Sequence, residues 1–94
     1  MEITEVRVSP IHGDEKLKAF ATVIFDDAFV VRDLKIINGQ KGLFVAMPSR
    51  KMKDGSFKDI AHPLNNDMRQ KLEDAVKKEY ETKIQEEKQN QESE

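Results

Sequence analysis

Cysteine is absent from the 94 residues, and so is tryptophan. Without cysteine the chain can form neither a disulfide framework nor a thiolate metal site, and it suits the reducing environment of the cytosol. Its two histidines cannot supply the usual closed zinc site. The four glycines stand singly, so a glycine-rich phosphate loop is missing as well. We therefore expect no metal and no cofactor.

Long apolar runs are also missing. No stretch approaches the roughly 18 apolar residues of a membrane span, and residues 1–5 lack the basic region and apolar run of a secretory signal. We therefore expect a cytoplasmic protein without membrane contact. A nucleophile elbow is likewise missing, since Ser49 and Ser56 flank a loop. The sequence thus favours a binding protein with no small-molecule substrate, and not an enzyme.

Charge is plentiful but unevenly distributed along the chain. Charged residues make up 36% of the sequence and the net charge is −2. Residues 50–63 carry four Lys or Arg against two Asp or Glu, whereas residues 64–94 carry six against nine. A weakly acidic protein can still bind a polyanion through a concentrated positive segment, because charges interact over a Debye length of about 8 Å at physiological salt.

The first half of the chain has the pattern of short strands. Between residues 17 and 26 the side chains alternate with a period of two, which no helix produces. Three further segments are rich in β-branched and aromatic residues: 3–8, 29–37 and 43–47. Turns are predicted at residues 12–15, at Asp26-Asp27 and at Asn38-Gly39. Strands this close in sequence should pair antiparallel.

The second half predicts one long helix that ends near Glu87. Asn65 or Asn66 can cap its start, and apolar side chains recur at every fourth residue: Leu64, Met68, Leu72, Val76, Tyr80 and Ile84. Four residues advance about 400°, so this stripe drifts by roughly 40° per step, and Tyr80 and Ile84 leave the face set by Leu64. They either fray with the helix end or contact something other than the sheet.

These elements predict a single small α+β domain, an antiparallel sheet of four to five strands followed by one long C-terminal helix. The domain should span residues 1–84. Residues 85–94 contain no apolar side chain, and we expect them to form a disordered acidic tail.

Oligomeric state follows from the predicted sheet. Large apolar side chains lie on both faces of the strand at 17–26, for example Phe20 and Val23, and one helix can cover only one face. We expect the other face to pack against a second copy in a homodimer. The alternative is that the helix and residues 48–63 together cover both faces.

Residues 50–59 form a compact segment rich in positive charge. Asp54-Gly55 predicts a two-residue hairpin turn, which would pair Lys53 with Ser56, Met52 with Phe57, Lys51 with Lys58 and Arg50 with Asp59. Lys51, Lys53 and Lys58 would then share one face and Met52 and Phe57 the other. Lys51 opposite Lys58 destabilises the pairing unless a counter-charge is present, and a phosphate backbone supplies one.

The hairpin therefore predicts a nucleic-acid site formed by Arg50, Lys51, Lys53 and Lys58, with Phe57 available to stack on a base. An ordinary solvated hairpin is the alternative.

Two blocks beside this hairpin resemble a known family. Residues 42–51 read Gly-Leu-Phe-Val-Ala-Met-Pro-Ser-Arg-Lys, and residues 59–65 read Asp-Ile-Ala-His-Pro-Leu-Asn. With Asp54-Gly55 between them, they are similar to the signature of the bacterial stage V sporulation protein G (SpoVG) family. The resemblance extends from Met1 to about Tyr80. At Met52-Lys53 the chain departs from the family pattern, which has a small or polar residue and a proline there; the departure adds a charge and removes a rigid residue.

The resemblance implies a dimeric, cytoplasmic regulator that binds DNA or RNA and is linked to septation and sporulation. It also implies nucleic-acid contact through Arg50, Lys51 and Lys53. The alternative hypothesis is a protein-interaction module in cell division, which would meet a partner through Tyr80 and Ile84 without direct nucleic-acid contact.

Overall fold

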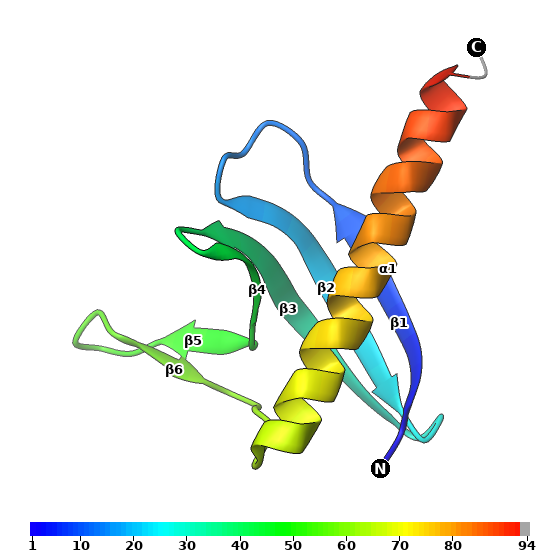
Figure 1. Ribbon diagram of the computed structural model, residues 1–94. Helices are drawn as coiled ribbons and strands as arrows, with labels where there is room; N and C mark the ends of the chain where they lie inside the picture. The colour runs from blue at the N-terminus through cyan, green and yellow to red at the C-terminus, as the bar shows by residue number, and fades with distance from the viewer. Residues whose placement is uncertain (93–94) are drawn as a thin grey trace.

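A four-stranded antiparallel sheet forms the centre of the computed structural model, which describes residues 1–92. Its strands lie in the order of the chain: β1 (Ile3–Pro10), β2 (Leu17–Phe25), β3 (Phe29–Gly39) and β4 (Gly42–Ala46). A separate two-stranded sheet follows, made of β5 (Ser49–Lys51) and β6 (Phe57–Asp59), and then the helix α1 (Asn66–Glu92) (Figure 1). The predicted α+β class, the antiparallel sheet and the single C-terminal helix are confirmed.

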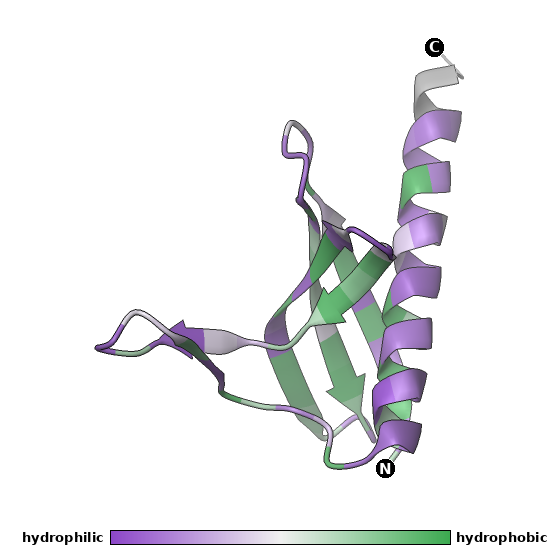
Figure 2. Ribbon diagram, turned by 60° about the vertical axis from the view of Figure 1, so that its left-hand side comes forward, coloured by the Kyte–Doolittle hydropathy of each residue, from purple (hydrophilic) through white to green (hydrophobic). Residues whose placement is uncertain are grey.

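The core lies between the sheet and α1. The alternation of β2 places Ala19, Ala21 and Val23 inward, each no more than 2% exposed, and the helix covers them with Leu72 and Val76. Figure 2 shows the apolar sheet beside a helix whose outward side is polar. The predicted period of two sets the buried face of β2. The strands that pair with β2 must match this face, so β2 fixes the register of the sheet.

The opposite face of the sheet has no helix over it (Figure 2). Three large apolar side chains on this outer face are two-fifths or more exposed: Phe20 at 40%, Val30 at 45% and Phe44 at 44%. The helix covers one face, as expected, and residues 48–63 do not bury the other. A second copy on this outer face stays a prediction.

Two of the predicted turns have different outcomes. Asp26 and Asp27 reverse the chain with φ of 51° and 50°, positive values that Asp tolerates well. The reversal predicted at Asn38-Gly39 is wrong, because β3 continues through both residues and the chain turns at Gln40 and Lys41. Gly39 serves close packing instead, since a Cβ atom there would lie 3.0 Å from the Phe44 ring.

The start of α1 is capped as predicted. Asn65 accepts a hydrogen bond from the Met68 backbone N–H at 2.8 Å through its side-chain oxygen, and Asp67 lies in the first turn near the positive end of the helix dipole. The Asn65 carbonyl also accepts a hydrogen bond from the Arg69 N–H at 3.1 Å. Asn65, and not Asn66, is therefore the N-cap.

The later part of α1 corrects one expectation about the apolar stripe. Tyr80 packs against the core cluster, so it neither frays nor turns away from the sheet. The helix contacts β1, β2 and β4, and a helix that crosses several twisted strands can use a drifting stripe. Ile84 is half-buried.

The helix continues to Glu92, five residues past its predicted end. His12 in the β1–β2 loop lies 3.0 Å from the Glu87 carboxylate, between Nε2 and Oε2. The disorder of residues 85–94 stays a prediction, and residues 93–94 lie outside the described part of the chain. No helix within residues 1–92 combines the length and apolar character needed to cross a bilayer.

Candidate nucleic-acid interface

Residues 49–59, which we call the arm, project from the body of the protein (Figure 1). Strands β5 and β6 pair antiparallel and form a sheet separate from the central one. The Ile60 N–H donates a hydrogen bond to the Pro48 carbonyl at 2.7 Å and so closes the base of the arm. Every arm residue except Met52 is exposed.

The turn at the tip is longer than the sequence predicted. The Gly55 N–H donates to the Met52 carbonyl at 3.0 Å, and the Met52 N–H donates to the Ser56 carbonyl at 2.7 Å. Lys53, Asp54 and Gly55 therefore form a three-residue loop in which Gly55 has a φ of 91°, the arrangement of a turn closed by a glycine bulge. The predicted two-residue turn is wrong by one position on the second strand.

The Asp54 side chain explains why the loop has three residues and not two. Its Oδ1 accepts hydrogen bonds from the Ser56 hydroxyl at 2.6 Å and from the Ser56 N–H at 2.9 Å. These bonds fold the side chain over the turn and favour the longer loop. The same two bonds, that from the hydroxyl first, hold the pKa of Asp54 below its ordinary value of 3.8.

The shifted register redistributes the cations between the faces of the arm. Arg50 pairs with Lys58, and Lys51 pairs with Phe57. Because side chains alternate along a strand, Arg50 and Lys58 share one face while Lys51 and Phe57 share the other. Lys53 lies in the loop. The prediction that the three lysines share one face, opposite Phe57, is therefore wrong.

Two like charges still oppose each other on the arm, but they are Arg50 and Lys58 and not Lys51 and Lys58. Arg50 and Lys58 stand directly opposite each other, and like charges in this position destabilise an antiparallel ladder. Among the described side chains, which are those of residues 1–89, the salt bridges join Arg7 to Glu5, Lys83 to Glu86 and, when His12 is protonated, His12 to Glu87. None of them involves an arm cation, so the described carboxylates leave the Arg50 and Lys58 charges without a salt bridge.

A shallow groove lies along this face of the arm. It has a volume of about 270 Å³ and is lined by Arg50, Met52, Lys58, Asp59 and Ile60. Met52 is half-buried and gives the groove an apolar surface beside the two cations. Sequence reasoning missed Met52 and Ile60 as groove residues, because the assumed register put Met52 on the face opposite Lys58.

The arm lies inside the region that comparison with known proteins covers. The SpoVG family model matches residues 1–82, from before β1 into the second half of α1. The chain belongs to the SpoVG family. The predicted resemblance is thereby confirmed.

Individual SpoVG relatives agree over most of their length. A protein of Anaeromyxobacter sp. (strain Fw109-5) is 57% identical over 84 residues, which are 89% of this chain and 86% of the relative. One of Thermoanaerobacter sp. (strain X514) is 59% identical over 81 residues, 86% of this chain and 88% of the relative. Both carry the name "Putative septation protein SpoVG".

Proposed function

We propose that this member of the SpoVG family is a regulator linked to septation and sporulation that binds DNA or RNA through its arm, and that it is not an enzyme. The link to septation rests on the names of its relatives. The nucleic-acid part rests on one observation, the Arg50–Lys58 pair on a projecting hairpin without a salt bridge to a described carboxylate.

The physical case for a polyanion is the cost of that pair. No salt bridge to a described carboxylate offsets the repulsion between these two charges, whereas a phosphate between them would be attracted to both. Both cations line the groove, together with Met52. Lys53 adds a third positive charge in the loop at the tip of the arm.

The remaining residues predicted for the site play different parts. Lys51 lies on the second face, so it contacts phosphate only if the strand wraps around the arm. Stacking of Phe57 on a base stays a prediction. The Phe57 side chain lies on the face opposite Arg50 and Lys58, so a base that stacks on it would have to reach the second face of the arm. Binding carried by phosphate contacts should depend little on base sequence.

An anisotropy titration tests the proposal. Labelled duplex DNA, single-stranded DNA and RNA of one length are titrated with the wild type, with Arg50→Ala/Lys58→Ala and with Lys16→Ala/Lys78→Ala. The last variant removes two exposed lysines outside the arm and matches the charge change. We expect the arm variant alone to lose most of its affinity. Equal affinity of the two variants would refute the role of the arm.

A second candidate function is a protein-interaction module in septation. The observation that favours it is the outer face of the sheet, where Phe20, Val30 and Phe44 are exposed. Tyr80 no longer supports this candidate, because it packs on the core. Affinity purification before and after nuclease treatment separates the two functions: a partner retained after nuclease treatment favours the interaction module.

A further inference from the structure

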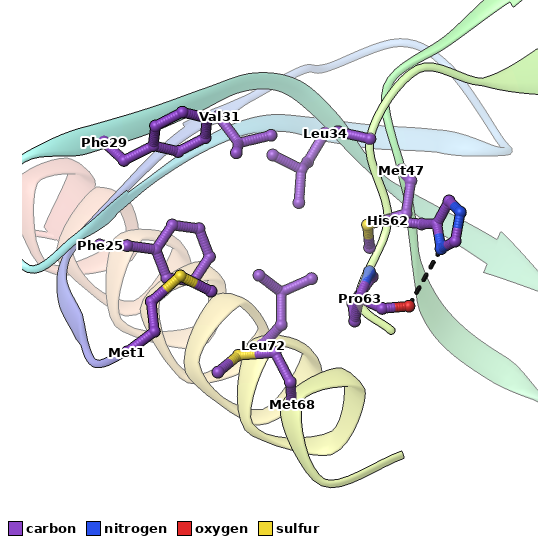
Figure 3. A pocket seen from close by; sticks show the side chains of 11 residues that line it. Met1, Phe25, Phe29, Val31, Leu34, Met47, His62, Pro63, Met68 and Leu72 are labelled. Carbon is purple, nitrogen blue, oxygen red and sulfur yellow. Dashed lines mark hydrogen bonds between the residues drawn. The ribbon is translucent and has the colours of Figure 1, made fainter. Parts of the chain in front are cut away.

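An apolar cavity opens at the end of the molecule near the start of α1 (Figure 3). Its volume is about 160 Å³, and Phe25, Phe29, Met47 and Met68 are among its lining side chains, with Met1 and His62 at its edges. The His62 Nδ1 lies 3.0 Å from the Pro63 carbonyl oxygen. Almost all of the remaining lining is apolar, so the cavity suits an apolar group.

The size of the cavity selects the class of occupant. Small-molecule sites usually measure about 300–1,000 Å³, whereas an engineered apolar cavity of about 150 Å³ holds one benzene ring. At about 160 Å³ this cavity matches a single aromatic ring. A side chain presented by a protein surface fits this size better than a cofactor or a metabolite does.

The chain itself carries a matching group. Phe57 is 70% exposed on the projecting arm, and it does not line the cavity of its own chain. An aromatic ring held that far out in water on a short hairpin gains free energy if it enters an apolar site, as buried anchors at protein interfaces do.

Charge complementarity favours a second copy as the source of the ring. The cavity residues Phe25 and Phe29 flank the turn that carries the exposed carboxylates of Asp26 and Asp27, and Glu2 follows Met1. On the arm, Lys51 is the cross-strand neighbour of Phe57 on the same face. A ring that enters the cavity thus brings a cation to an acidic edge.

We propose that Phe57 of one copy docks in this cavity of a second copy, with Lys51 beside the second copy's acidic turn. Reciprocal exchange of arms gives a closed dimer, because each chain carries both the ring and the cavity. The docked face is the Lys51–Phe57 face. The Arg50–Lys58 face stays open, so docking and the proposed phosphate contacts use different sides of one arm.

Methionine methyl groups test the proposal directly. The chain has four methionines, of which Met1, Met47 and Met68 line the cavity and Met52 lies on the other face of the arm. A full-length Phe57→Ala chain with ¹³C-labelled methionine methyls is titrated with unlabelled wild type. We expect ring-current shifts at the three cavity methyls, because the incoming ring comes only from the unlabelled copy.

The same titration with unlabelled Phe57→Ala chain is the control and should leave the cavity methyls unshifted. Equal spectra with the two titrants would overturn the proposal, as would shifts confined to Met52. Sedimentation provides a second readout: Phe57→Ala should weaken self-association at least about tenfold, and Met52→Ala should not. Unchanged self-association of Phe57→Ala would also overturn it.

The outcome is separable from that of the proposed function. Phe57→Ala retains Arg50 and Lys58, and Arg50→Ala/Lys58→Ala retains the ring. The titration can be repeated with an unlabelled Arg50→Ala/Lys58→Ala chain, which keeps Phe57. Shifts of the labelled cavity methyls that persist with this titrant would support docking whether or not the variant binds oligonucleotide.

Discussion

The salt dependence of oligonucleotide binding should reveal how many arm cations contact phosphates. Each neutralised phosphate on duplex DNA contributes about −0.9 to the slope of log affinity against log salt. If Arg50, Lys51, Lys53 and Lys58 all contribute, the slope is about −3.6 per protomer. Raising salt from 50 to 200 mM then weakens binding about 150-fold.

Removal of the opposed pair should halve this dependence. Arg50→Ala/Lys58→Ala eliminates two contacts, so we expect a slope near −1.8 and only about a tenfold loss over the same salt range. The assay is fluorescence anisotropy on a duplex at several salt concentrations, with Lys16→Ala/Lys78→Ala as the matched control. The control should keep the wild-type slope, and an arm variant that also keeps it would refute the assignment of the contacts to the arm.

Lys51→Ala then distinguishes two ways in which nucleic acid can lie on the arm. A strand confined to the Arg50–Lys58 groove predicts an unchanged slope, because Lys51 lies on the other face. A strand that wraps around the tip predicts a slope shallower by about 0.9.

Three further predictions concern the fold. Depression of the Asp54 pKa means that its hydrogen bonds stabilise the arm turn above pH 3.8 and are lost as pH falls through the lower folded value; the Ser56 amide shift should follow this titration, and in Asp54→Asn it should not. Asn65→Ala should lower the free energy of unfolding by about 1 kcal/mol in urea, because α1 loses its N-cap; an unchanged midpoint would contradict this. Val76→Ala should cost about 2 kcal/mol, since Val76 is 0% exposed, whereas Leu64→Ala, at 92% exposed, should cost almost nothing; equal costs would contradict the packing.

The sequence was most informative where one physical signal dominated. The alternation in β2 identified its buried face, because a half-buried strand must repeat every two residues. Asp26-Asp27 was recognised as a turn, and Asn65 as a possible cap, from side-chain chemistry that acts within a few residues.

Sequence reasoning failed where a contact between elements or a competing local bond decided the outcome. Asn38-Gly39 looks like a turn, yet Gly39 is needed where the Phe44 ring lies against the backbone. At the arm tip, the bonds from Ser56 to Asp54 selected the three-residue loop and reversed the expected partition of the lysines. The drift of the apolar stripe, taken for a helix alone, predicts that Tyr80 leaves the sheet. The twist of the sheet instead brings the sheet to Tyr80, which packs on the core.

The most direct test of the central claim is the response of Met52 to nucleic acid. Its side chain lies in the groove with Arg50 and Lys58, whereas Met68 lies on α1. In a ¹³C-methyl spectrum of the wild type titrated with duplex oligonucleotide, we expect the Met52 signal to shift in parallel with the anisotropy and the Met68 signal to stay in place. A Met52 signal that is unchanged at saturating oligonucleotide would contradict the account.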